Sequence, residues 1–376
     1  MIENTLFYKD NYLSEFDAKV VESFEEKGKN YVVLDNTAFY PEGGGQPSDV
    51  GLLNDVKVIF VEEKNDKIYH QVEKKIEVGQ KVHGKIDFDY RFSNMQSHSA
   101  EHIVSGIICK RYNASNVGFH IGKDFVTMDF NKPIDHSDII EIEKIANEAV
   151  YKNIDIEIKI YPNEEAKKME YRSKIELNED VRIVEIPGYD RCACCGVHVN
   201  KTGEIGIIKL FKIENYKSGV RVYMVAGYKA VKDYTEKYKQ LDNISTLLSL
   251  KIENVYEGIV ALENEFERLK QENSKLKMDL FKKDIEALEN DEKIIVVNDN
   301  YQPQDMKKYC EYILNSKDTK IAGIITNNKF VLMSESCDLK EVLENLKSKI
   351  DIKGGGNSQL IQGQFNGLTE DLLKII

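Results

Sequence analysis

The chain has few cysteines and no long apolar segment, and each absence excludes a class of protein. Six cysteines in 376 residues are too few for a disulfide-based scaffold, and Cys109, Cys310 and Cys337 stand alone. No segment approaches the roughly 18 consecutive apolar residues that a membrane span needs. The first residues, MIENTLFYKDNYLSEF, show no basic region followed by an apolar run. We therefore expect a cytoplasmic protein with no membrane partner.

Positive charge is also in deficit. A net charge of −12 argues against broad, nonspecific coating of nucleic acid, although a local basic face remains open. The stretch IKLFKIENYKSGVRV offers such a face through Lys209, Lys212, Lys217 and Arg221, and the alternative is a solvated strand edge. The content of 41% hydrophobic and 31% charged residues is typical of a soluble globular protein.

The hydrophobic pattern divides the chain into four parts. Several domains are expected, because chains longer than about 250 to 300 residues usually form more than one hydrophobic core. Residues 1–90 alternate apolar and polar residues in KNYVVLDNT and DVKVIFVEEKNDKIYHQV, which predicts an antiparallel β-barrel. Residues 91–228 mix two helical patterns with strands in FVTMDF and DIEIKIYP. Residues 229–290 are helical, and residues 291–376 predict a small α/β domain. The predicted fold class is α+β.

The helical part contains an unbroken heptad seam. Its seam positions follow one another in alternating steps of three and four residues. All of them are apolar except Asn273. An asparagine at an a position fixes register and strand number at some cost in stability. This pattern predicts a homodimer through residues 252–280. The seam consists of Ile252, Val255, Ile259, Leu262, Phe266, Leu269, Asn273, Leu276 and Leu280.

Charges beside the seam favour the same interpretation. Glu265 with Lys270, and Glu272 with Lys277, have opposite signs at the positions that meet across a parallel two-stranded coil. The alternative is that the seam packs on the preceding helix, residues 229–249, as a hairpin within one chain.

Four metal-binding side chains occur as two short pairs. His98 and His102 in HSAEH are four residues apart, so that both imidazoles lie on one face of a helix. Cys194 and His198 in CACCGVHV are also four apart. Each pair is weak evidence alone, but together they make a set of three nitrogens and one sulfur that suits zinc. We expect one zinc ion per chain.

Other readings of the cysteine cluster stay open. Cys192 or Cys195 could supply the sulfur, the two could form a redox pair, or all the thiols could be inert core residues. No thioredoxin-like context supports the redox alternative. Glu101 does not stand where an HExxH metalloprotease has its glutamate, and we expect it to be a solvated helix residue.

A third element is the segment TAFYPEGGGQ, from Thr37 to Gln46. Its glycines, Gly43, Gly44 and Gly45, allow a positive φ or a close approach of the backbone to a ligand, and Gln46 offers both a donor and an acceptor. The segment lacks the Gly-Lys-Ser/Thr of a phosphate-binding P-loop. A wide hairpin turn is the alternative.

These three elements, in this order, resemble the alanyl-tRNA editing family, which comprises the editing domain of alanyl-tRNA synthetase and free-standing AlaX-type proteins. The family pattern FYPxGGGQ, HxxxH and CxxxH followed by a TGEIG-like run is matched by FYPEGGGQPSDVG, HSAEH and CCGVHVNKTGEIG. The resemblance spans most of the chain. Because no amino-acid-activating domain precedes residue 1, a free-standing editor is expected.

The resemblance implies hydrolysis of the ester that joins a wrong amino acid, chiefly serine and also glycine, to tRNA-Ala. It implies zinc on the two pairs described above, and a catalytic or substrate-reading role for Thr37 and Gln46 beside the glycine loop. The C-terminal GGGNSQLIQGQF resembles a DHH-associated domain, in which Gly354, Gly355 and Gly356 would contact tRNA unless they form only a loop.

Two departures from the family pattern stand out. Cys195-Gly196-Val197 replaces the usual Gly-Gly-Thr between the cysteine and the histidine, and Asn357-Ser358-Gln359 follows the last glycines. Two alternative functions remain. One is a threonyl-type editing domain, which shares the zinc motifs, and the other is a noncatalytic tRNA-binding protein with a structural zinc.

Overall fold

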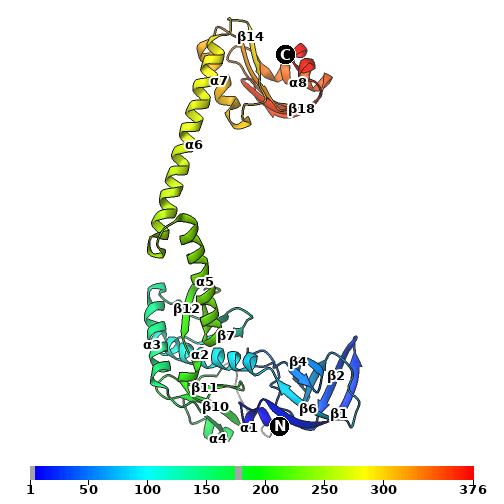
Figure 1. The fold of residues 1–376 in the computed structure, drawn as a ribbon, viewed down its shortest axis with the longest axis vertical. Helices are drawn as coiled ribbons and strands as arrows, with labels where there is room; N and C mark the ends of the chain where they lie inside the picture. Colours follow the sequence, from blue (N-terminus) through cyan, green and yellow to red (C-terminus); the bar gives the residue numbers. More distant parts are fainter. Residues whose placement is uncertain (1–4, 174–179) are drawn as a thin grey trace. The chain divides into compact units, whose positions relative to one another are not determined.

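The computed structural model describes residues 5–173 and 180–376 and divides into two compact units, Met1–Ile244 and Ser245–Ile376 (Figure 1). The boundary between the units falls near the end of helix α5 (Gly227–Leu248), inside the third predicted part. The finer division into four domains stays a prediction. In the described ranges, no helix is both long and apolar enough to cross a membrane.

The first unit begins with a closed barrel of six antiparallel strands in the order β1-β2-β5-β4-β3-β6. Side chains alternate between buried and exposed along β6, as a strand with one face in a core requires. The tight turn at Asn65 and Asp66 has positive φ at both residues, which suits the twist of a two-residue hairpin. The predicted N-terminal barrel is confirmed. Its strands are β1 (Glu15–Glu26), β2 (Lys29–Leu34), β3 (Gly51–Leu53), β4 (Val56–Lys64), β5 (Lys67–Val72) and β6 (Lys81–Ile86).

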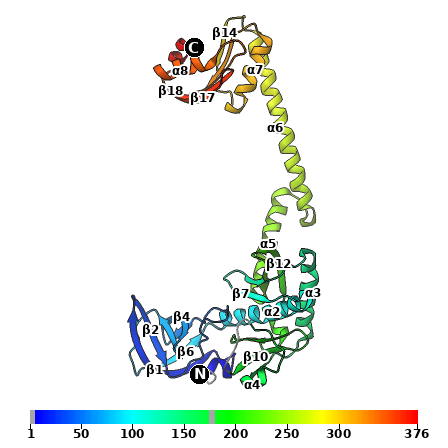
Figure 2. The same ribbon diagram turned by 180° about the vertical axis from the view of Figure 1, so that it is seen from behind.

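Helix α2 (Phe88–Tyr112) follows the barrel and lies between two further sheets (Figures 1 and 2). The Asp87 side chain caps it by accepting a hydrogen bond from the backbone N–H of Tyr90, and Asn113 ends it in the left-handed conformation. Contacts with strands of both sheets bury most of the helix around its whole circumference. It is therefore a central core helix, and it carries the HSAEH motif.

One sheet has the order β12-β13-β8-β7 and the other the order β11-β10-β9. The helices and strands predicted for this region are present. The remaining elements of this unit are α1 (Leu6–Lys9), β7 (Asn116–Ile121), β8 (Val126–Phe130), η2 (His136–Asp138), α3 (Ile139–Lys152), β9 (Glu157–Tyr161), α4 (Asn163–Ala166), β10 (Val181–Ile186), β11 (Asp190–Ala193), η3 (Thr202–Ile205), β12 (Ile208–Tyr216), β13 (Gly219–Ala226) and α5 (Gly227–Leu248).

The basic stretch on β12 and β13 does not form a free cationic patch. Ion pairs join Lys209 to Glu143, Lys212 to Glu214 and Arg221 to Asp129, while Lys217 lies over the ring of Tyr216. Carboxylates within the chain thus neutralise three of the four cations, as expected of a solvated strand edge.

The second unit has a five-stranded sheet in the order β14-β15-β16-β18-β17, in which β14 and β15 are parallel and joined by a crossover through α7. Gly354, Gly355 and Gly356 belong to β17, which pairs with β18, so the alternative that they form only a loop is wrong. The elements are η4 (Ile252–Asn254), α6 (Val255–Glu286), β14 (Lys293–Val297), η5 (Pro303–Asp305), α7 (Met306–Ser316), β15 (Ile321–Thr326), β16 (Lys329–Met333), α8 (Leu339–Lys349), β17 (Asp351–Gly356), β18 (Leu360–Asn366) and α9 (Thr369–Ile375).

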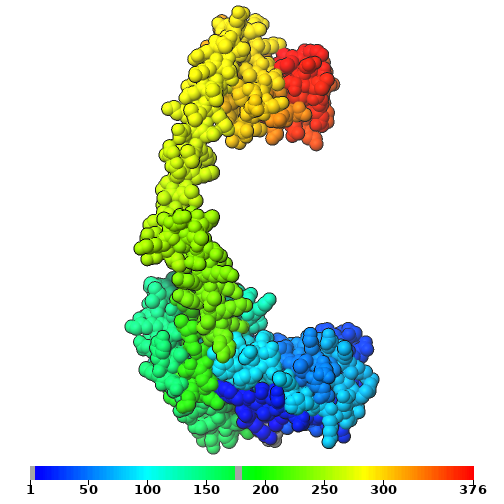
Figure 3. Space-filling model, in the orientation of Figure 1, coloured from blue at the N-terminus to red at the C-terminus, as the bar shows by residue number. Residues whose placement is uncertain are grey.

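Helix α6 carries the heptad seam after Ile252. Its apolar seam residues are exposed from Ile259 onward, whereas Val255 is buried. Leu262 is 58% exposed and Phe266 is 63% exposed. The helix is drawn in yellow in the space-filling view of Figure 3. Dimerisation stays a prediction.

Candidate metal centre

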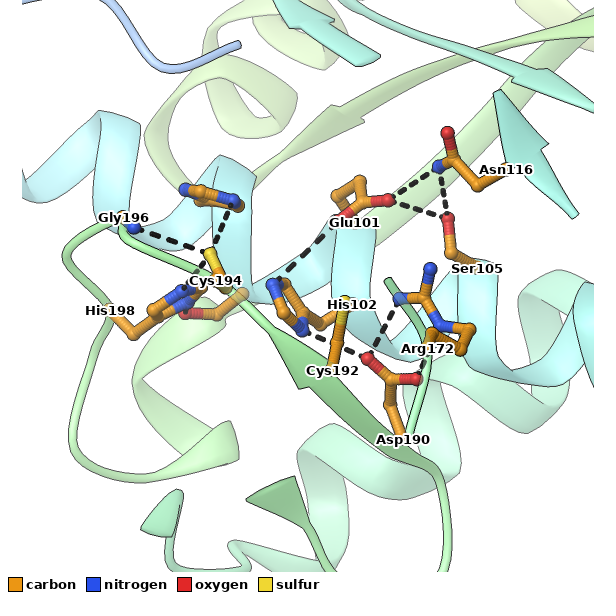
Figure 4. Close-up of polar contacts among 12 residues, drawn as sticks. Glu101, His102, Ser105, Asn116, Arg172, Asp190, Cys192, Cys194, Gly196 and His198 are labelled. Atoms are coloured by element: carbon orange, nitrogen blue, oxygen red, sulfur yellow. Dashed lines mark hydrogen bonds and ion pairs between the residues drawn. The ribbon is translucent and has the colours of Figure 1, made fainter. Parts of the chain in front are cut away.

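Two segments about a hundred residues apart place three imidazoles and one thiol together. Helix α2 supplies His98 and His102, and the loop after β11 supplies Cys194 and His198 (Figure 4). One ligand atom from each of these residues lies within 4.8 Å of the others. The Sγ of Cys194 lies 3.4 Å from Nε2 of His98 and 3.4 Å from Nε2 of His198.

The opposite nitrogen of each imidazole is held by the protein. His98 Nδ1 bonds to Gln46 Oε1 at 2.7 Å, His102 Nδ1 to Asp190 Oδ2 at 2.9 Å, and His198 Nδ1 to Ser99 Oγ at 3.1 Å. With each Nδ1 engaged, all three Nε2 atoms are left for a shared ligand. Outer partners of this kind fix the ring orientation in metal sites.

The donor set fits a zinc ion. Zinc bonds of about 2.0–2.1 Å to nitrogen and 2.3 Å to sulfur place tetrahedral ligands roughly 3.4–3.8 Å apart, and the two sulfur–nitrogen distances lie at the lower end of this range. Burial alone would raise the pKa of Cys194, but the neighbouring imidazoles hold it well below its usual value. Burial lowers the pKa of His198 to about 3. A thiolate and a neutral imidazole are the forms that bind metal.

Asp190 contacts His102 on the Nδ1 side of its ring, and Arg172 in turn holds Asp190. The guanidinium of Arg172 donates two hydrogen bonds to Asp190, 2.6 Å to Oδ1 and 2.8 Å to Oδ2. Burial would raise the pKa of Asp190, but Arg172 and His102 lower it overall. Asp190 is thus an anionic acceptor that orients His102. The sequence reasoning missed both residues. The position of Asp190 shortly before the cysteine cluster was the only available signal.

Glu101 corrects an expectation, because it is not a solvated helix residue. It is 3% exposed, and its Oε1 accepts hydrogen bonds from Ser105 Oγ at 2.6 Å and from Asn116 Nδ2 at 2.7 Å (Figure 4). Its Oε2 lies 3.9 Å from His102 Nε2. The error arose because α2 is covered on every side, so no face of it in this turn meets water.

The other two thiols of the cluster lie outside the four-residue group. Cys192 is buried and comes close to His102 and Asp190, and burial raises the pKa of its thiol. Cys195 is an exposed residue, but its sulfur is partly covered, and this burial raises the pKa of its thiol. The structure thus brings Cys194 to the three imidazoles, while the assignment of the sulfur ligand itself stays a prediction.

The glycine loop, residues 43–46, places Gln46 beside this centre. Gly44 and Gly45 have positive φ, and a Cβ on Gly45 would lie 2.4 Å from the carbonyl oxygen of Phe119 in β7. Only glycine permits this close approach. Gln46 is 1% exposed, and its Nε2 has no hydrogen-bond partner within the described chain. An amide donor buried without a partner is rare and points to a missing acceptor.

Thr37 takes a different position. Its hydroxyl lies inside the barrel, 2.9 Å from His70 Nε2, and accepts a hydrogen bond from the backbone N–H of Phe39 at 3.1 Å. The four metal-facing residues are not among its hydrogen-bond partners in the described residues. The structure therefore brings Gln46, but not the Thr37 hydroxyl, into contact with the cluster.

The glycines of the second unit line a separate pocket of about 480 Å³. The residues that line it include Gly354, Gly355 and Gly356, together with Lys329 and Lys353. The two lysines suit an anionic ligand.

Comparisons with known proteins agree with the motifs. Residues 5–90 match the family model described as tRNA synthetases class II (A), and residues 181–223 match the threonyl and alanyl tRNA synthetase second additional domain. The alanyl-tRNA editing protein AlaX-L of Pyrococcus horikoshii is 30% identical over 100% of this chain and 97% of its own length. The alanine–tRNA ligase of Methanobrevibacter smithii is 31% identical over 95% of this chain, which spans 43% of the ligase. A solved structure of RecJ from Thermus thermophilus has 16% identity and a TM-score of 0.25 over 33% of this chain and 21% of its own, too low to support a conclusion.

Proposed function

The chain belongs to the alanyl-tRNA editing family, and from this premise we propose that it hydrolyses the aminoacyl ester of mischarged tRNA-Ala. Ser-tRNA-Ala is the expected substrate, with Gly-tRNA-Ala as a second. In this proposal residues 1–90 and 91–228 form the deacylase, residues 229–290 serve dimerisation, and residues 291–376 contact tRNA through the glycine-lined pocket.

The buried cluster of three imidazoles and one thiolate carries this proposal. His98, His102, Cys194 and His198 would hold one zinc ion, which would supply a Lewis acid that polarises the ester carbonyl or a water molecule. Asp190 and Ser99 hold the imidazoles of His102 and His198 by Nδ1, so that each Nε2 would be available to the ion. Because four protein ligands close a tetrahedral shell, a carbonyl or water would meet the ion only as a fifth ligand. Groups beside the ion must therefore orient the substrate.

Gln46 is the group best placed to do so. Its Oε1 is already engaged by His98, which leaves the two N–H bonds of Nε2 free to donate. We assign to this amide the binding of the ester carbonyl oxygen, whose negative charge grows as water attacks. Donors fixed in advance at such an oxygen contribute strongly to ester hydrolysis.

Selection of serine requires a hydroxyl reader, and Thr37 keeps this role as a proposal. A buried polar group that bonds to the serine hydroxyl would be left unpaired by alanine, and this disfavours the correct product. The Thr37 hydroxyl bonds to His70 and accepts a hydrogen bond from the Phe39 N–H. One of its three hydrogen-bonding sites would therefore be left for a substrate hydroxyl.

Deacylation assays test the function directly. The full chain is incubated with Ser-tRNA-Ala, Gly-tRNA-Ala and Ala-tRNA-Ala, each with and without a zinc chelator. We expect hydrolysis of the first two above the spontaneous rate and its loss after chelation. If Ser-tRNA-Ala and Gly-tRNA-Ala both decay at the spontaneous rate while tRNA still binds, the chain is a noncatalytic tRNA-binding protein. A preference for mischarged tRNA-Thr would indicate a threonyl-type editor.

A further inference from the structure

The peptide bond between Cys195 and Gly196 lies inside the loop of residues 194–198, which we call the ligand loop, and both of its ends are held. The hydroxyl of Tyr8 donates a hydrogen bond to the carbonyl oxygen of Cys195 at 2.8 Å. The N–H of Gly196 donates to Sγ of Cys194 at 3.3 Å (Figure 4). Tyr8 belongs to helix α1, 187 residues from Cys195 in the sequence. One peptide group thus connects the N-terminal segment to a metal-facing sulfur.

These two hydrogen bonds depend on each other because a peptide group is planar. The bond between Cys195 and Gly196 is trans, and in a trans peptide the C=O and the N–H point in opposite directions. When the carbonyl of Cys195 points toward Tyr8, the N–H of Gly196 points the other way, toward the sulfur. Without the hydroxyl of Tyr8, this peptide would lose the contact that sets its rotation.

Arg182 in β10 holds the ligand loop on either side of this peptide. Its Nη1 donates to the carbonyl oxygen of Cys194 at 2.7 Å and to that of Gly196 at 2.9 Å. Its guanidinium carbon lies 4.7 Å from the centre of the Tyr8 ring, which is a cation–π contact. Arg182 therefore fixes the two flanking carbonyls and packs on a ring that would stay in place without its hydroxyl.

The sulfur that receives the N–H of Gly196 is the one that faces the three imidazoles. It lies 3.4 Å from Nε2 of His98 and 3.4 Å from Nε2 of His198. A hydrogen bond to a thiolate draws negative charge from the sulfur, so the thiolate donates less to a bound metal ion. An ion that receives less charge from its ligands is a stronger Lewis acid toward a carbonyl.

We propose that Tyr8 is a positioning residue of the metal centre, whose hydroxyl turns the Cys195–Gly196 peptide so that the N–H of Gly196 bonds to the thiolate of Cys194. This inference rests on the proposed zinc site and deacylase function, and it deepens them by giving a task to a residue outside the four ligands. Tyr8 acts through Cys194 and not on the substrate. The kcat should therefore depend on its hydroxyl, and the KM should not.

The test compares wild type with Tyr8→Phe and with a matched control, Tyr12→Phe. Each variant keeps an aromatic ring in the N-terminal segment and loses one hydroxyl. The hydroxyl of Tyr12 accepts a hydrogen bond from the N–H of Asn200 at 3.1 Å and donates one to Glu204, both beyond the ligand loop. Co²⁺ is the probe, because Zn²⁺ has a filled d shell, whereas the thiolate-to-cobalt charge-transfer band reports the electron density on the sulfur.

In Tyr8→Phe the charge-transfer band is expected to move to lower energy, because a thiolate without its N–H partner gives up an electron more readily. The variant should still bind about one Co²⁺ per chain, since all four ligands remain. At saturating metal, its kcat for Ser-tRNA-Ala should be about 10-fold lower at an unchanged KM. Tyr12→Phe should match wild type in the band energy, kcat and KM.

A charge-transfer band at the wild-type energy in Tyr8→Phe would overturn the assignment. An equal shift in Tyr12→Phe would also overturn it, because any loosening of the N-terminal segment would then have the same effect. A raised KM at an unchanged kcat would instead place Tyr8 on the substrate. If wild type binds no Co²⁺, the proposed metal site itself fails. If it binds Co²⁺ but leaves mischarged tRNA-Ala intact, the deacylase function fails while the spectra still decide the role of Tyr8.

Discussion

Gln46 and His98 are joined by a 2.7 Å hydrogen bond, although they are 52 residues apart in the sequence and the four strands β3 to β6 lie between them. Gln46 closes the glycine loop, and His98 lies in the middle of α2. This bond couples the loop to the metal centre, because a change in the amide also changes the orientation of a metal-facing imidazole.

Replacement of Gln46 tests both of its proposed tasks. Gln46→Ala should lower kcat for Ser-tRNA-Ala about 100- to 1,000-fold, as removal of one oxyanion donor does, and should weaken metal binding about 10-fold through loss of the partner of His98. The measurements are single-turnover deacylation and competition with a chromophoric chelator. Glu42→Gln, an exposed change in the same loop, is the control. An unchanged kcat would remove Gln46 from the chemistry.

The metal ligands can be assigned by counting zinc in purified variants. Wild type should contain about one zinc per chain, while His98→Ala and Cys194→Ala should contain little, because each of these variants removes one of four converging ligands. Cys195→Ala should keep its zinc, because Cys195 lies outside the cluster. Loss of zinc from Cys195→Ala alone would show that the sulfur ligand had been assigned to the wrong residue.

The sequence predicted the four metal-facing residues but not what surrounds them. Spacing of four residues is readable without a structure, since it sets two side chains on one helix face or one turn. The roles of Glu101, Arg172 and Asp190 depend on how sheets cover α2 from both sides. That packing joins residues far apart in sequence, and no local period records it.

Buried His70 makes the barrel sensitive to acid. Burial lowers its pKa from 6.5 to about 4, so the folded state disfavours the proton that the unfolded chain accepts. The neutral, buried imidazole thereby contributes up to about 3 kcal/mol to the free energy of unfolding. This contribution is fully present above pH 6.5 and is lost as the pH falls through about 4. Denaturant unfolding of wild type and His70→Gln at pH 7 and pH 4.5 should show a smaller acid loss in the variant. Exposed His83→Gln is the control, and equal losses in all three proteins would contradict the prediction.

The exposed seam of α6 predicts a dimer in solution. Sedimentation should give two chains per particle, and Leu262→Glu or Leu269→Glu should dissociate them, because each places a charge at a d position. Val260→Glu changes an exposed apolar residue of the same helix outside the seam, so it should remain dimeric. A monomeric wild type would exclude the seam as an interface.

Gly196 is the one position between Cys194 and His198 at which a side chain cannot be accommodated. A Cβ there would lie 2.1 Å from Cε1 and 2.3 Å from Nδ1 of His98, and 3.0 Å from Oε1 of Gln46. The loop of Gly196 also carries Cys194 and His198, so it cannot move away without displacing these two side chains. Gly196→Ala is therefore expected to displace the His98 imidazole and break its hydrogen bond to Gln46. We expect metal affinity to fall about 10- to 100-fold. Gly43→Ala, whose Cβ would meet its nearest neighbour at 3.5 Å, should bind metal as wild type does. Gly196 follows the family pattern, whereas its neighbours Cys195 and Val197 depart from it. Unchanged metal binding in Gly196→Ala would mean that His98 does not bind the metal in the orientation seen here.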